Sequence, residues 1–136
     1  MNDTPVALTP LSEDDCWRLL REHRPRLGRV AFRDGGVTVV YPMNYAVAGR
    51  TVYLRTEPGG TLASAVRDQD VAFEVDHVDV AWERGWSVLA QGRVHEVDDP
   101  DELEEHRDLP LRAWAPGTRL HLLGLEVARI SGRRIA

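Results

Sequence analysis

Residues 37–66, VTVVYPMNYAVAGRTVYLRTEPGGTLASAV, decide the fold of this chain. They predict a strand over Val37–Val47, a turn at 48–50, a second strand over Thr51–Thr56, a glycine-rich loop and the start of a helix. Arg55 and Thr56 lie where the second strand meets the loop. An arginine, hydroxyl groups and bare glycine backbone before a helix N-terminus suit an anionic group. The stretch therefore predicts the phosphate end of a cofactor site, although a short polar pair of this kind is also typical of a solvated strand end.

The sequence on both sides of this stretch predicts further short strands and a few short helices. A helix begins at Ser12, whose hydroxyl can cap it, and ends before Pro25. Further helices are expected over 62–67 and 98–106. The remaining strands are expected over 27–32, 71–75, 86–97 and 120–130, with a bulge or bend at Gly92. Residues 1–10 are expected to be loose, and residues 131–136 are expected to form a polar tail.

Six mostly antiparallel strands joined by glycine turns predict a mainly β fold, closed as a small barrel. Pro42 has no N–H for a ladder, so its strand should have a free edge or a bulge there. With 136 residues, no repeat and no long linker, the chain is expected to be one domain over 1–136.

The composition is that of an ordinary soluble globular protein. The net charge of −5 argues against broad nucleic-acid binding, which needs a basic surface. The one cysteine, Cys16, excludes an internal disulfide, and it is expected to be a buried apolar residue rather than a nucleophile. No signal peptide or membrane-spanning run is recognisable, and no cluster has metal-ligand spacing, so a cytoplasmic location is expected, without metal, membrane or nucleic-acid partners.

Several other side chains are open to two readings. The histidines His77, His95 and His121 belong to no recognisable constellation, and His77 is the one candidate for a place near a cofactor. Alternation puts Glu74 and Asp76 on one face of their strand, either as a carboxylate pair or as partners of surface arginines. The run Asp98–His106 indicates a solvated helix face.

Five sequence pieces, in order, resemble the pyridoxamine 5′-phosphate oxidase-like flavin-binding split-barrel family, and its short bacterial subgroup in particular. The pieces are LGRVAF (27–32), YPMNY (41–45), LRTEPGGTLASA (54–65), VAFEVD (71–76) and GWSVLAQGRVHEV (85–97), and the later AWAPG (113–117) and ISGRR (130–134) also fit.

The resemblance implies a six-stranded antiparallel split β-barrel that pairs as a homodimer and binds flavin mononucleotide, FMN, in two grooves along the dimer interface. Relatives bind the deazaflavin F420, and a few bind haem. Four sets of residues are implied to bind the cofactor. They are Pro42, Met43, Asn44 and Tyr45 along the isoalloxazine ring; Arg55 and Thr56 at the phosphate; Gly60, Thr61 and Leu62 in the phosphate loop; and Trp86, Ser87 and Val88 from the neighbouring strand or the partner subunit.

Tryptophans add to this picture. Trp86 and Trp114 are expected to line the pocket, while Trp82 is expected to be structural or at its rim. A dimer also makes physical sense, because a flavin groove on so small a barrel needs a second wall. True oxidation of pyridoxamine phosphate is not expected, because the chain offers no second well-marked phosphate site.

One position departs from the subgroup. Where relatives often carry a lysine in a Gly-Ser-Lys-Leu pattern, this chain has Thr61 within Gly59–Leu62, which leaves Arg55 as the main cation and Arg67 as a possible substitute. Losing one charge-assisted contact weakens phosphate binding by about 1.5–3 kcal/mol. The sequence thus predicts an FMN-dependent oxidoreductase acting on a small flat substrate, with no catalytic side chain assigned because the cofactor supplies the reactivity. The alternative is a non-catalytic module that binds flavin, F420 or haem.

Overall fold

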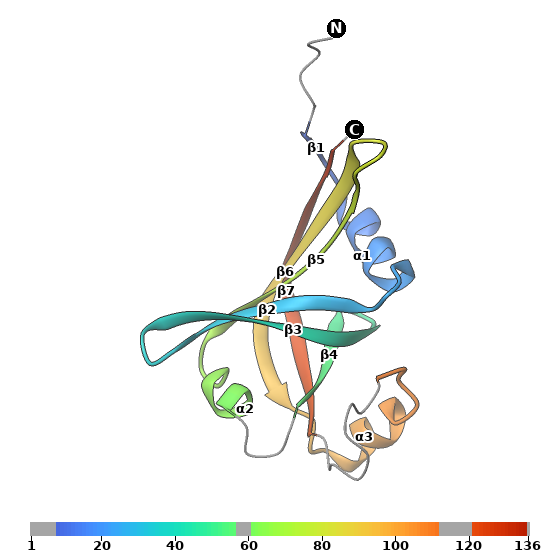
Figure 1. The fold of residues 1–136 in the computed structure, drawn as a ribbon. Helices are drawn as coiled ribbons and strands as arrows, with labels where there is room; N and C mark the ends of the chain where they lie inside the picture. The colour runs from blue at the N-terminus through green and yellow to red at the C-terminus, as the bar shows by residue number, and fades with distance from the viewer. Residues whose placement is uncertain (1–7, 57–60, 112–120, 136) are drawn as a thin grey trace, which may run out of the picture.

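The computed structural model describes residues 8–56, 61–111 and 121–135, and only the backbone of Thr61. Within these residues, antiparallel strands form one sheet that closes on itself (Figure 1). The elements are β1 (Leu8–Pro10), α1 (Glu13–Glu22), β2 (Leu27–Asp34), β3 (Val37–Ala48), β4 (Thr51–Thr56), α2 (Thr61–Ala65), β5 (Asp70–Asp79), β6 (Arg84–Glu96), α3 (Pro100–His106) and β7 (His121–Ile135).

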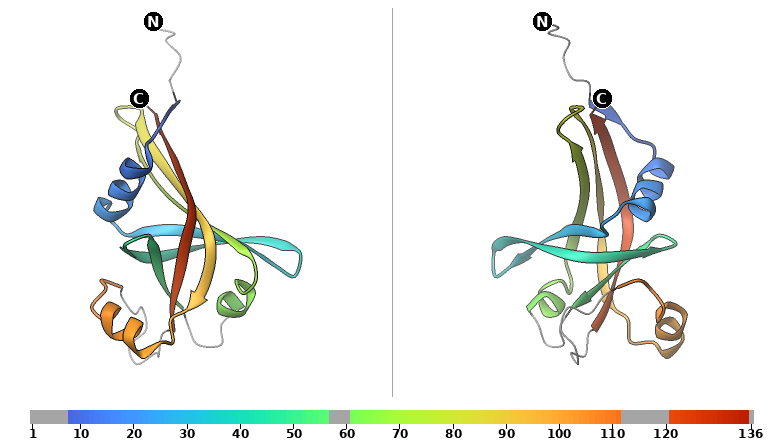
Figure 2. Two further views of the ribbon diagram at one scale, coloured as in Figure 1. Left: turned by 180° about the vertical axis from the view of Figure 1, so that it is seen from behind. Right: turned by 45° about the vertical axis from the view of Figure 1, so that its right-hand side comes forward.

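The sheet closes because β7 pairs with β4 on one side and with β6 on the other. The ring therefore consists of the six strands β2–β7, as the sequence predicts, and β1 lies outside it on the edge of β7. In Figures 1 and 2 the β2–β3 hairpin runs across the long strands β5, β6 and β7.

Two differences from the sequence-based expectation concern the ends of the chain. Leu8–Pro10 are not loose, since they pair with Arg133–Ile135. The segment after Ile130 is not a tail either, because β7 continues to Ile135 and stays paired with β6. Its polar composition reflects exposed side chains on a strand whose backbone is paired on both sides.

The barrel interior is filled by alternating residues of every strand. In β4, Val52, Leu54 and Thr56 point inward and are buried, while Tyr53 and Arg55 belong to the other face. The bulge predicted at Gly92 is present as a register shift between Gln91 and Gly92. A Cβ at Gly92 would lie 1.8 Å from the carbonyl oxygen of Glu126, so only glycine fits there.

One end of the barrel is covered by α1. Ser12 caps this helix by accepting a hydrogen bond from the backbone N–H of Asp15 at 3.1 Å, as predicted. Cys16 and Leu20 are buried in the core, and burial raises the pKa of the Cys16 thiol. Beyond α1, the β5–β6 hairpin and the end of β7 continue as an arm (Figure 1). Among the described helices, none is long and apolar enough to cross a membrane.

Candidate functional site

Arg55 is the second-last residue of β4, next to the point where the chain leaves the sheet. Its cross-strand partner is Leu122 of β7, and that of Thr56 is His121. The strand pattern buries Thr56 inside the barrel and turns Arg55 to the outer face, where its Nε atom is buried without a hydrogen-bond partner among the described residues. A buried guanidinium N–H without a protein partner is a donor that a ligand can satisfy.

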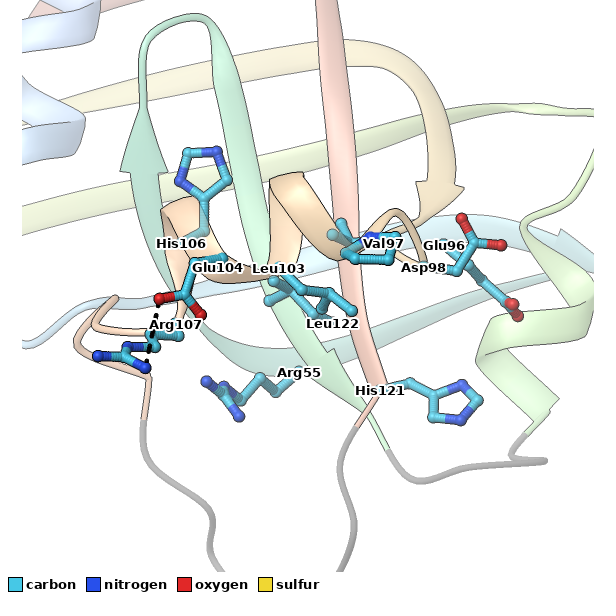
Figure 3. Close-up of a pocket in the computed structure, with 11 residues that line it drawn as sticks. Arg55, Glu96, Val97, Asp98, Leu103, Glu104, His106, Arg107, His121 and Leu122 are labelled. Carbon is cyan, nitrogen blue, oxygen red and sulfur yellow. Dashed lines mark ion pairs between the residues drawn. The ribbon is translucent and has the colours of Figure 1, made fainter.

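Beside Arg55, a cavity of about 780 Å³ opens between α3 and the ends of β4, β6 and β7. Figure 3 shows Arg55 reaching into the space below α3, with His121 on the opposite side. Val97, Leu103 and Leu122 give the cavity an apolar wall. Its volume falls in the range of small-molecule and cofactor sites.

The charged groups around this cavity are mostly paired with each other. Arg107 contacts Glu104 at 3.3 Å, and Glu96 contacts Arg67 at 3.1 Å. Arg67, the possible substitute for the missing loop lysine, is therefore held by an acid that itself lines the cavity. Among the described residues that line the cavity, Arg55 is the arginine left without an acidic partner, so a bound anion can engage it.

The helix α3 is held on the barrel by Glu102. Its Oε1 accepts a hydrogen bond from Tyr53 at 3.3 Å and lies 3.1 Å from His95 Nε2. The His95 ring covers Gly124, where a Cβ would come within 2.6 Å of it. Burial, followed by the Glu102 carboxylate, raises the pKa of Tyr53 to about 12. This network fixes the wall that faces Arg55.

The residues expected along a flavin ring lie on β3, which is the neighbour of β4 in the sheet. Pro42 and Asn44 pair with Arg29 and Leu27 of β2, whereas pairing with β4 begins only at Tyr45. Pro42 therefore sits where one side of β3 has no paired strand, as a residue without N–H requires. Met43 packs against the core.

Tyr45 is a core residue by its side chain. It is fully buried, it donates a hydrogen bond from its hydroxyl to the carbonyl of Leu20 at 2.7 Å, and it packs edge-on against Phe73. Only its backbone remains for a ligand on the outer face. Leu62 and Val88 are also core residues, while Gly60, the side chain of Thr61 and Trp114 lie outside the described part of the chain.

Trp86 and Ser87 stand far from Arg55. They pair with Arg134 and Arg133 on β7, and Leu122, the partner of Arg55, is twelve residues earlier on the same strand than Arg134. At about 3.3 Å per residue, this separation reaches up to roughly 40 Å in a straight strand. One copy of the chain therefore does not bring the two expected parts of the site together.

Around Trp86, the arm carries a second group of polar and aromatic side chains. The His23 ring packs edge-on against Trp86 with centroids 5.0 Å apart, and His77 lies 5.6 Å from His23. Burial lowers the pKa of His23. Trp82 is 71% exposed near the tip of the arm, in the turn between β5 and β6.

Sequence reasoning missed the contribution of α3 to the Arg55 cavity. The run Asp98–His106 reads as a solvated face, yet Leu103 and His106 line the cavity and Glu102 anchors the helix. The spacing of Leu103 and His106, three residues apart, was the one available signal of an inward face.

The comparison with known proteins agrees with this fold. Residues 12–134 match the family described as Pyridoxamine 5′-phosphate oxidase. This chain belongs to that family. The structure of the FAD binding protein from Mycobacterium smegmatis has a TM-score of 0.81 and 35% identity, covering 95% of this chain and 98% of that one.

Two further relatives extend the comparison. An FAD-binding protein from Mesorhizobium loti has a TM-score of 0.78 at 24% identity, covering 95% of this chain and 99% of that one, which speaks for the fold alone. The uncharacterized protein Rv0080 of Mycobacterium tuberculosis is 30% identical over 132 residues, which are 92% of this chain and 84% of that protein. The two structural matches support the split-barrel fold that the sequence predicts.

Proposed function

We propose that this chain binds a flavin nucleotide whose phosphate lies against Arg55. The observation that carries the proposal is the Arg55 side chain, which has a buried Nε without a partner among the described residues and opens onto a cavity of about 780 Å³. A phosphate oxygen is an acceptor with which a guanidinium forms strong, charge-assisted hydrogen bonds. The likeness to an FAD binding protein at 35% identity supports a flavin as the ligand.

Two flavin nucleotides are candidates. The sequence favours FMN, whose terminal phosphate Arg55 and the following loop would bind. The M. smegmatis relative binds FAD, which makes FAD the second candidate. The family resemblance also implies F420 and haem as possible ligands. Their affinities are compared with those of FMN and FAD in the titration described below.

We further propose that two copies of the chain share each site as a homodimer. Arg55 and Trp86 pair with residues at opposite ends of β7, so a flavin that contacts both receives them from different copies. Symmetric dimers are the commonest assembly of soluble proteins and produce two equivalent sites.

The activity we propose is hydride transfer to or from a small flat substrate. A bound flavin supplies the hydride chemistry. The residues of this chain bind and orient it, and the apolar wall at Val97, Leu103 and Leu122 excludes water. The competing proposal is a binding module without turnover. Reduction of the bound flavin by NADH or NADPH, followed through its visible absorbance, supports the enzyme, and a flavin that stays oxidised supports the module.

Flavin binding is tested by fluorescence titration of the purified protein, stripped of ligand, with FMN and with FAD. Arg55→Ala is expected to weaken binding by about tenfold to a hundredfold, since it removes a charge-assisted contact to phosphate. Arg93→Ala is the matched control, because Arg93 is an exposed arginine paired with Asp70 outside the cavity. Equal affinities of the Arg55→Ala and Arg93→Ala variants contradict the assignment.

A further inference from the structure

The cavity beside Arg55 extends away from the strand that is expected to hold a flavin ring. Arg55 is on β4, whose neighbours in the sheet are β3 and β7. The strand residues that line the cavity belong to β4, β6 and β7, and none of the described lining residues is on β3. The cavity and the residues Pro42–Tyr45 of β3 therefore lie on opposite sides of Arg55.

The size of this cavity exceeds what a phosphate alone requires. FMN ends at its phosphate, so FMN with its ring along β3 and its phosphate at Arg55 would not reach far into the cavity. FAD continues from the same phosphate into a second phosphate, a ribose and an adenine. A volume of about 780 Å³ is in the range of cavities that enclose drug-sized molecules, and an adenosine is a group of that kind.

One part of the cavity is an apolar surface. Val97 and Leu122 are buried in its wall, and the backbone N–H of Val97 donates a hydrogen bond to the carbonyl of Leu122 at 2.9 Å. Leu103 of α3 also lines the cavity, and it is 39% exposed (Figure 3). Apolar surface that is open to water inside a cavity favours a ligand with an apolar face. An adenine ring has such a face, whereas a phosphate gains nothing from these side chains.

The cavity also has two polar ends, a cationic one at Arg55 and an acidic one at Asp98. Leu122 lies between the strand of Arg55 and the segment of Asp98. It pairs with Arg55 on one side and accepts the hydrogen bond from Val97 on the other. Two spacings between neighbouring strands amount to about 10 Å. The ligand that fills the cavity is therefore longer than a single phosphate and touches both ends.

The two ends require different groups on that ligand. Arg55 binds an anion. At the other end Glu96 is held by Arg67 at 3.1 Å, whereas Asp98 has no ion-pair partner among the described residues. A carboxylate repels an anion and accepts hydrogen bonds, so the group near Asp98 must carry N–H or O–H donors. The ribose hydroxyls and the amino group of an adenosine are such donors, and acidic residues bind ribose hydroxyls in dinucleotide sites.

We propose that this cavity holds the adenosine half of FAD. The diphosphate lies at Arg55, the adenine lies on the apolar surface of Val97, Leu103 and Leu122, and N–H or O–H groups of the adenosine donate to Asp98. The inference rests on the flavin site proposed above and selects FAD over FMN as its ligand.

The test is isothermal titration of the full chain, stripped of ligand, with FAD, FMN and AMP. The wild type is expected to bind FAD at least about tenfold more tightly than FMN, because burying an adenine removes more apolar surface from water than a tenfold change requires. AMP, which is the adenosine half alone, is expected to bind weakly and to compete with FAD.

Two variants locate the adenosine. Asp98→Ala removes the acceptor and is expected to lower the preference for FAD over FMN by about tenfold. Its control is Asp101→Ala, because Asp101 is an acid of the first turn of α3 that does not line the cavity. Leu103→Asn replaces apolar surface by an amide of similar size and is expected to lower the same preference by about fivefold to tenfold. Its control is Leu8→Asn, at an exposed leucine on β1.

The outcomes separate this inference from the proposed function. A wild type that binds FMN as tightly as FAD overturns the inference, and so do Asp98→Ala and Leu103→Asn variants that keep the wild-type preference. FMN binding that depends on Arg55, without AMP binding and without a preference for FAD, contradicts only the inference. Binding of AMP that Asp98→Ala weakens, in a protein that binds neither flavin, contradicts the proposed function while the adenosine site stands.

Discussion

At the scale of single residues, Tyr45 shows how a site motif divides between core and surface. The motif YPMNY predicts a ring wall at 42–45, and the alternation of β3 turns the Tyr45 side chain into the barrel. There its hydroxyl donates to the carbonyl of Leu20, and burial raises the pKa of the phenol to about 12. Any contact of Tyr45 with a flavin therefore comes from its backbone, and its side chain connects β3 to α1.

Tyr45→Phe tests this division. The substitution leaves the buried carbonyl of Leu20 without its hydroxyl donor and is expected to lower the free energy of unfolding by about 1–2 kcal/mol. The affinity for flavin is expected to stay within about twofold, because the ring face keeps its backbone. Urea denaturation measures the first quantity and fluorescence titration the second. A large loss of flavin affinity at unchanged stability would place the side chain in the site instead.

At the scale of elements, the sequence predicts every strand of the ring but not its full length. The glycine turns and alternating patterns locate β2, β3, β4 and β6 closely, because local turn chemistry and period are readable from single residues. The strand expected over 71–75 is β5, which extends to Asp79. The end of β7 is not readable in this way. Ser131, Arg133 and Arg134 look like a tail, and they form strand only because β6 and β1 pair with their backbone.

The bulge in β6 makes an element-level prediction. Gly92→Ala puts a methyl group 1.8 Å from the carbonyl oxygen of Glu126 and is expected to destabilise the fold by at least about 3 kcal/mol. Gly35→Ala serves as the comparison. Gly35 has a φ of +59° but open space around it, so its substitution is expected to cost about 1–2 kcal/mol. Thermal unfolding of both variants checks the order, and a Gly92→Ala variant as stable as Gly35→Ala contradicts it.

At the scale of the whole molecule, the sequence predicts individual residues of the candidate site. It does not predict which distant segments come together around the cavity. Arg55, with its strand end and loop, was found from local signals. Leu103 and His106 line the same cavity through α3, some fifty residues later in the chain, and no local pattern joins them to Arg55. Nor does local sequence reveal that Trp86 lies at the opposite end of β7 from Arg55.

Sharing of the site between two copies predicts complementation. Arg55→Ala and Trp86→Ala are each expected to weaken both sites of their own dimers. When the two variants are unfolded together and refolded as a mixture, each mixed dimer regains one site with both residues intact. Because half the dimers are mixed and each restores one of two sites, about a quarter of the sites should bind flavin at wild-type affinity. Isothermal titration measures this fraction, and a mixture that binds no better than the separate variants excludes sharing between Arg55 and Trp86.

The pairing of β1 with the end of β7 determines where a further domain can be fused to this barrel. Leu8 lies beside Ile135, so both ends of the described chain leave from the same corner of the barrel (Figure 1). That corner is at the Trp86 end of β7, far along the strand from Arg55. A domain fused in frame before β1 or after β7 would be attached at this same corner. It would leave the mouth of the Arg55 cavity open.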